Sequence, residues 1–221
     1  VLPEAYTTRP RLIGWFTFGA IGMVFLYAGF MGGAVAVVRE HEKRTLARIL
    51  ASPIGSWDLF IGKLLGNILI LTPAALLCVA TGLALGAKLE WSPLRLEHWL
   101  VAALLLMVLL MCVGIGFILT IVSRAKSSEG ASGLALALGL TLSFIAGIWL
   151  PKWMLAAPLR SLADSFPVTW ALDAVRAIMV YEASLSEVAF DVARSAVATV
   201  AIMALAAASY KALMRRYYAK A

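Results

Sequence analysis

Few residues of this chain have the type and spacing that catalysis requires. Hydroxyl side chains that could act as nucleophiles occur within long apolar stretches, at Thr72, Thr81, Thr120, Ser132, Thr141 and Ser143. A hydrolase or acyltransferase needs a general base beside its nucleophile, and no histidine or carboxylate partners any of these hydroxyls. The two histidines, His41 and His98, lie in or beside connections between the stretches. The sequence therefore disfavours an intramembrane enzyme and predicts no catalytic residue.

Motifs for a bound cofactor or metal are also missing from the sequence. The string most similar to a phosphate loop has six residues between Gly55 and Gly62, and a leucine follows Lys63. An ATP-binding loop needs a shorter spacing, and a Ser or Thr after the lysine to reach magnesium. The two cysteines, Cys78 and Cys112, form no CxxC spacing and have no histidine partner, which argues against a metal site or a disulfide. We therefore expect this chain to bind no ATP, magnesium or other metal itself.

The composition identifies lipid as the solvent for this chain. Of its 221 residues, 62% are apolar and 14% are charged, and the mean hydropathy is +0.92. Soluble domains are roughly 45–50% apolar and about 25% charged. Such a chain cannot cover its apolar surface with polar side chains, which excludes a soluble enzyme and a nucleic-acid-binding module. The basic pI of 9.7 needs another explanation.

Five apolar stretches are long enough to cross a bilayer as helices. They are residues 12–38, 59–86, 99–122, 130–150 and 188–210. A crossing of about 30 Å needs about 20 residues, and a backbone in lipid must satisfy its own hydrogen bonds. We therefore expect an all-α polytopic membrane protein with one transmembrane domain over residues 1–221. The odd number of spans also suggests that a first span precedes this segment.

The distribution of charge orients the predicted bundle. One set of connections, with the tail after Tyr210, carries 11 basic and 4 acidic residues, whereas the opposite set carries 8 of each. The whole formal charge of +7 thus belongs to one side, which the positive-inside rule makes cytoplasmic. We expect a multi-pass protein of the plasma (inner) membrane with a cytoplasmic C-terminus. The first four spans contain a single ionisable residue, Lys63, which disfavours a carrier coupled to protons or ions.

The first cytoplasmic connection contains an amphipathic segment over residues 40–52. Leu46, Ile49, Leu50 and Pro53 share one helical face, and charged residues cover much of the remainder. An interfacial helix at the lipid headgroups and a helix docked on a cytoplasmic partner explain this pattern equally well.

The longest connection on the opposite side, residues 151–187, is too apolar for a free loop. Its stretches 153–162 and 168–181 are too short to span a membrane, so we expect re-entrant helices over about residues 151–181. Asp173 and Arg176 are three residues apart and can form an ion pair. This pair could be a satisfied surface couple or part of a gate.

Taken in order, these strings resemble the permease subunits of type-2 ABC exporters. The family has a cytoplasmic string close to E-x-E-x-G-T-L-E-x-L-L-x-S-P and then a glycine-lysine pair. This sequence has Glu40, Glu42, Thr45, Leu46, Ile49, Leu50, Ser52 and Pro53, followed by Gly62 and Lys63. Arg44 and Ala47 replace the usual glycine and glutamate. The later proline-aromatic turns of the family correspond to Pro151, Phe166, Pro167, Trp170, Asp173 and Arg176.

The resemblance implies a function and a set of partners. A complete permease of this family has six spans, and two permeases work with two ABC ATPase subunits or domains. The matching residues between Glu40 and Pro53 would be the ATPase-coupling interface, and the residues from Pro151 to Arg176 an outer gate. ATP and magnesium would be bound by the ATPase.

We therefore expect an ATP-driven exporter of a hydrophobic or amphipathic substrate, such as a lipid-linked molecule, a drug or a glycan. The alternative is a structural scaffold subunit that transports nothing. We also expect a homodimer whose seam includes Gly29 and Gly33, because small residues allow close approach of helices in lipid. Packing of such glycines within one chain is the alternative.

Overall fold

The computed structural model describes residues 8–42, 54–89, 95–123 and 127–218, and over these residues the fold is helical without strands. Five helices are long and apolar enough to cross a membrane. These candidate spans are Arg9–Ala36, Ser56–Ala84, Leu96–Ile121, Ser128–Ile145 and Leu185–Met214. The prediction of an all-α polytopic membrane protein is therefore confirmed.

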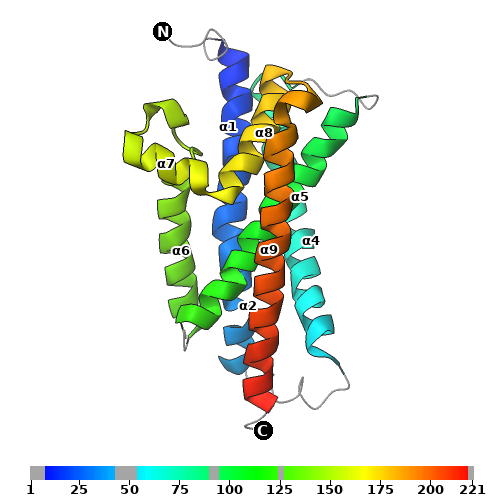
Figure 1. The fold of residues 1–221 in the computed structure, drawn as a ribbon, viewed down its shortest axis with the longest axis vertical. Helices are drawn as coiled ribbons and strands as arrows, with labels where there is room; N and C mark the ends of the chain where they lie inside the picture. The colour runs from blue at the N-terminus through cyan, green and yellow to red at the C-terminus, as the bar shows by residue number, and fades with distance from the viewer. Residues whose placement is uncertain (1–7, 43–53, 90–94, 124–126, 219–221) are drawn as a thin grey trace.

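The first span is one continuous rod of three helical segments. It consists of α1 (Arg9–Val24), the π-helical turn η2 (Phe25–Gly29) and α2 (Phe30–Glu42). Pro10 stands in the first turn of α1, where a proline has no intrahelical hydrogen bond to lose. The rod runs the length of the bundle (Figure 1), so its last turns carry Arg39, Glu40 and Glu42 beyond the apolar part.

The other long helices are α4 (Ser56–Ala84), α5 (Leu96–Ser123), α6 (Ser128–Ile145) and α9 (Leu185–Tyr218). The α6 helix ends five residues before the boundary predicted at Leu150. The reason is local, because Gly147 takes a positive φ of 67° that turns the chain. The short helices η3 (Lys152–Met154), α7 (Ala157–Ser165) and α8 (Pro167–Tyr181) follow.

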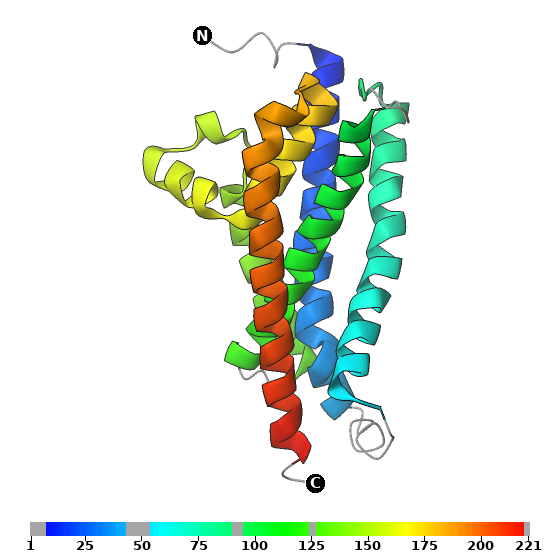
Figure 2. The ribbon, with the colours of Figure 1, turned by 45° about the vertical axis from the view of Figure 1, so that its right-hand side comes forward.

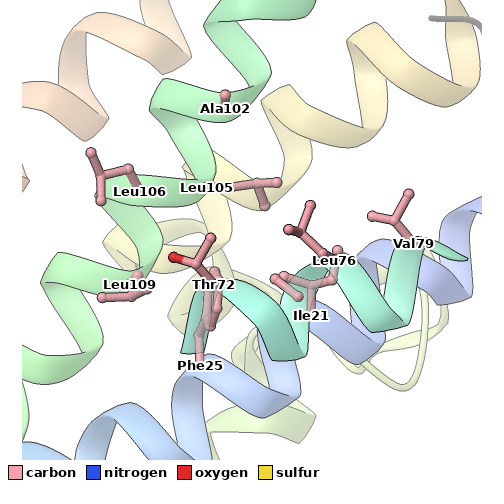
Figure 3. A pocket seen from close by; sticks show the side chains of 10 residues that line it. Ile21, Phe25, Thr72, Leu76, Val79, Ala102, Leu105, Leu106 and Leu109 are labelled. Carbon is pink, nitrogen blue, oxygen red and sulfur yellow. The ribbon is translucent and has the colours of Figure 1, made fainter. Parts of the chain in front are cut away.

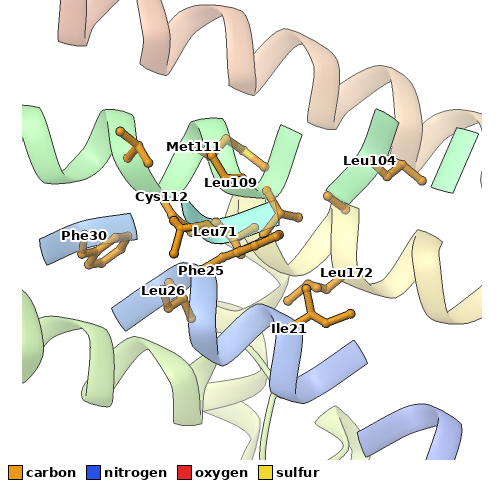
Figure 4. Packing of buried hydrophobic residues seen from close by; sticks show 14 of the residues in the cluster. Ile21, Phe25, Leu26, Phe30, Leu71, Leu104, Leu109, Met111, Cys112 and Leu172 are labelled. Atoms are coloured by element: carbon orange, nitrogen blue, oxygen red, sulfur yellow. The ribbon is translucent and has the colours of Figure 1, made fainter. Parts of the chain in front are cut away.

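The α5 helix forms the centre of the bundle. It packs against α2, α8 and α9, and Figure 2 shows α4 at one edge of the bundle with α7 projecting from the other side. The core joins Ile21 and Phe25 of the first rod to Leu104 and Leu109 of α5 and Leu172 of α8 (Figure 4). Neither α7 nor α8 is among the candidate spans, because helices of 9 and 15 residues are too short to cross a membrane.

The bundle has two ends with different chemistry (Figure 1). At one end α2 terminates and α4 and α6 begin, and we call this the Glu40 end. At the other end lie α7, α8 and the start of α9, and we call this the Arg176 end. Between the ends, α4 and α9 present large apolar side chains outward, including Leu69, Ile70 and Phe190, each more than 70% exposed. Lipid is the solvent that suits such surfaces.

Candidate functional site

At the Glu40 end, the last turn of α2 is joined to α4 by an ion pair. The ammonium group of Lys63 contacts the carboxylate of Glu40 and also donates to the carbonyl of Ala36 at 2.6 Å. The side chains of Lys63 and Glu40 are only 16% and 20% exposed. Within α4, the Asn67 amide donates to the Lys63 carbonyl at 2.9 Å. A lysine two turns inside an apolar span thus has its charge compensated by the preceding helix.

The second glutamate of the same string contacts a different helix. The backbone N–H of Ser128 donates to Glu42 at 2.8 Å, and the Ser128 hydroxyl donates to the other carboxylate oxygen. Ser128 is the first residue of α6, whose N-terminus carries the positive end of the helix dipole. Ser127 caps the same helix by accepting from the N–H of Gly130 at 3.0 Å. A carboxylate is therefore well placed at this terminus.

The structure describes only part of the predicted coupling interface. Thr45, Leu46, Ile49, Leu50, Ser52 and Pro53 lie outside the described residues. Glu40 and Glu42 are described, and they contact Lys63 and Ser128 of this chain. The sequence analysis missed both partners. The signal that could have found one of them was the single lysine in the first four spans, which needs an acid within reach.

Two hollows flank the end of α2. One, of about 530 Å³, is lined by residues that include Glu40, Asp58 and Lys63. The other, of about 400 Å³, is lined by residues that include Arg39 and Ser128. The end of α2 is therefore accessible on the sides that face α4 and α6.

The Arg176 end contains a cluster of charged groups. Lys152 of η3 lies 3.0 Å from a carboxylate oxygen of Asp164 and 2.5 Å from one of Asp173. Arg176 also approaches Asp173, at 3.9 Å, so the predicted pair of these two residues exists. Lys152 is the closer partner of Asp173, and the sequence analysis did not find it. Residues 152 and 173 are brought together only by the turn between α7 and α8.

The ionisation of this cluster follows from its partial burial. Burial raises the pKa of Asp173 above its ordinary value, although Lys152 and Arg176 pull it down. For Lys152, burial favours the neutral amine, but the two carboxylates outweigh burial and raise the pKa above the ordinary value of 10.5. Lys152 is therefore charged at neutral pH and holds η3, α7 and α8 together.

Arg176 is the most deeply buried charge of this cluster, with 3% of its side chain exposed. Its guanidinium donates to the carbonyl of Gly147 at 3.1 Å and lies 4.0 Å from the centre of the Trp15 ring. These contacts join α8 to the turn after α6 and to α1. The cation–π contact stabilises a charge that is largely removed from water.

The remaining predicted gate residues lie around this cluster. The Trp170 indole donates to the carbonyl of Asp164 at 2.6 Å, and the Arg194 guanidinium of α9 lies 4.5 Å from the Trp170 ring. Phe166 and Pro167 form the turn between α7 and α8, and the carbonyl of Pro151 accepts from Met154 at 2.9 Å. The sequence thus selected residues that the fold brings to one end of the molecule.

The two glycines of the expected dimer seam contact another helix of the same chain. Gly29 and Gly33 are both buried, and a Cβ at Gly33 would lie 2.3 Å from the carbonyl oxygen of Val113 and 2.9 Å from the Cα of Gly116. A Cβ at Gly29 would lie 3.0 Å from that of Cys112. These glycines therefore pack on α5 of the same chain, which is the alternative that the sequence left open for them.

An apolar cavity of about 290 Å³ lies between α1, α4 and α5 (Figure 3). Ile21 and Phe25 line one wall, Leu76 and Val79 another, and Leu105 a third. Thr72 supplies the hydroxyl in this lining. The cavity can accommodate a hydrophobic group and offers no acid–base pair. Among the described residues, no group of three or more His, Cys, Asp or Glu could hold a metal ion.

The fold and the site thus define a helical polytopic membrane protein with ion-paired ends. Residues 5–208 match the family model described as ABC-2 family transporter protein. The chain belongs to this family of transporter permeases. No curated protein and no solved structure matches the chain significantly.

Proposed function

We propose that this chain is the permease subunit of an ATP-driven exporter whose ATPase is a separate subunit. The observation that carries the proposal is the family match over residues 5–208, which includes every candidate span except the last residues of α9. Members of this family are transmembrane subunits, so the hydrolysis of ATP belongs to the partner ATPase. The chain would supply the pathway for the substrate.

The two ends of the bundle support a division of roles. The connections at the Glu40 end belong to the basic set, which favours a cytoplasmic location for this end and for the C-terminus. The segment over residues 40–52 would then be the coupling helix that contacts the ATPase. The Arg176 end would face outward, with residues Pro151 to Arg176 as the outer gate. The plasma membrane is the membrane we propose.

The proposed substrate is hydrophobic or amphipathic, such as a lipid-linked molecule, a drug or a glycan. The apolar cavity beside Phe25 and Leu105 supports this class, because it offers almost no polar atoms to a hydrophilic solute. The spans carry few charges to coordinate an ion. Two copies of the permease would work together, since a twofold pair is the commonest symmetric assembly.

The test is reconstitution of the permease in lipid vesicles with the ATPase that co-purifies with it. A panel of lipids, drugs and glycolipids is then added, and the rate of ATP hydrolysis is measured. The proposal expects at least one apolar member of the panel to stimulate hydrolysis and to accumulate on the side opposite the ATPase. A complex that contains no ATPase, or that transports nothing, would instead support the scaffold alternative.

A further inference from the structure

We propose that Glu40 and Glu42 are positioning residues that pass movement of the coupling segment to two different helices, Glu40 to α4 and Glu42 to α6. This inference rests on the proposed function, because it concerns how an ATPase would act on the permease. It assigns to these glutamates contacts within the permease, whereas the sequence placed them at the ATPase.

The contact of Glu40 couples the end of α2 to the first turns of α4. Lys63 contacts Glu40 and the Ala36 carbonyl at the same time, so its ammonium group is held by two groups of α2. Both charged side chains are at least four-fifths buried. Separating such a pair takes the counter-charge away from a largely buried lysine, which is costly. The two helices should therefore move together at this point.

The contact of Glu42 couples the same end of α2 to α6. Its two carboxylate oxygens accept from the backbone N–H and the hydroxyl of Ser128, which opens α6. Because the N–H groups of a helix N-terminus have no intrahelical acceptor, the carboxylate serves as their partner. A displacement of Glu42 would therefore displace the start of α6.

The spacing of the two glutamates explains why each contacts a different helix. Residues at positions i and i+2 of a helix do not share a face, since successive residues are rotated by about 100°. Glu40 and Glu42 can therefore reach α4 and α6 on different sides of α2. The two hollows beside Glu40 and beside Ser128 lie on these sides.

The experiment measures the two connections separately. The complete permease, assembled with its ATPase in lipid nanodiscs, has Cys78 and Cys112 replaced by alanine. A single reporter cysteine is introduced by Gly66→Cys on α4 or by Gly133→Cys on α6, where an added Cβ meets nothing within 4 Å. The rate of reaction with N-ethylmaleimide is compared in ADP and in ATP with magnesium and vanadate.

The parent protein should show a nucleotide-dependent rate at both reporters. The Glu40→Gln variant should reduce this dependence about tenfold at the α4 reporter and preserve it at the α6 reporter, because a charged hydrogen bond is worth about a factor of ten. The Glu42→Gln variant should give the reverse pattern. Exchange of the charges by Glu40→Lys with Lys63→Glu should restore the α4 response, which a loss of stability alone would not predict.

Glu129→Gln provides the matched control, because Glu129 is exposed one residue beyond Ser128. It should change neither response. Where a glutamine variant does not accumulate, Glu40→Asp and Glu42→Asp are measured in the same way, because a shorter carboxylate weakens the contact and keeps the charge.

The results distinguish the inference from the function on which it rests. A parent complex without an ATPase, or without any response to ATP, would overturn both proposals. A parent complex that responds, together with variants that keep both responses or lose both equally, would overturn this inference alone. Loss at one reporter only, in the pattern given above, would support it.

Discussion

Lys152 and Arg176 approach the same carboxylate, that of Asp173, from two different elements. The distance to the carboxylate is 2.5 Å for Lys152 and 3.9 Å for Arg176. The Arg176 guanidinium also donates to the Gly147 carbonyl and lies over the Trp15 ring. The lysine is therefore the main counter-charge of Asp173. This division of roles yields a prediction at alkaline pH.

The contribution of Lys152 to stability should be lost at high pH. Because the pKa of Lys152 in the folded protein is raised above 10.5, its contribution is complete below pH 10.5 and falls as the pH rises through the folded-state value. The protection factors of the amides of residues 152–173, which correct exchange for the base-catalysed intrinsic rate, should therefore fall in this range. The Lys152→Gln variant should lose about 1 kcal/mol at neutral pH and show no such fall in protection. An identical alkaline response in both proteins would contradict the assignment.

A second residue-scale prediction concerns the glycine contact between α2 and α5. Gly33→Ala should lower the free energy of unfolding by about 1–3 kcal/mol, because the added Cβ would lie 2.3 Å from the Val113 carbonyl. Thermal unfolding in nanodiscs measures this effect. Gly66→Ala is the control and should be neutral or slightly stabilising, since its Cβ meets nothing within 4 Å and alanine favours a helix. Equal effects at both positions would contradict the contact.

Both ends of α6 are defined by groups that lie outside the helix. Its first turn receives the Ser127 hydroxyl and the Glu42 carboxylate, and the turn at Gly147 ends it early. One face of α6 packs on α2 and η2 through Ala131, Ala135 and Gly139, whereas Leu136 and Leu140 on its outward side are about half exposed. The position of α6 therefore depends on this packed face and on the contacts at its two ends.

Removal of the cap should loosen the start of α6. Ser127→Ala deletes the acceptor of the Gly130 N–H and should cost about 1 kcal/mol. Faster hydrogen exchange at Gly130 and Ala131 measures this loss. Ser132→Ala, within the same helix, should leave exchange in the first turn unchanged. A first turn that is equally protected in both variants would show that the cap contributes little.

At the scale of the whole molecule, the two ends should face opposite sides of the membrane. Cysteines introduced by Ser161→Cys on α7 and Ser186→Cys on α9 lie at exposed positions of the Arg176 end, and Glu129→Cys lies at the Glu40 end. In intact cells, an impermeant maleimide should label the first two variants and not the third. Permeabilised cells, in which all three should react, provide the control. Labelling of Glu129→Cys from outside would reverse the topology.

The sequence alone determined the class of the protein. Five long apolar stretches admit only helices in lipid, because each backbone must satisfy its hydrogen bonds within its own segment. Composition and local periodicity therefore predicted the helical membrane fold and its five spans. The family could be identified from the order of short strings such as Glu40 to Pro53, and the match over residues 5–208 confirmed it.

The partners of individual residues were decided only by the tertiary structure. Glu40 and Lys63 are 23 residues apart, and Glu42 and Ser128 are 86 apart, so no local pattern connects them. For Gly29 and Gly33, the sequence shows a small-residue face but cannot tell a neighbouring helix from a second copy. Small residues allow close approach to any helix in lipid. The packing of α2 on α5 assigned this face to the interior of the chain.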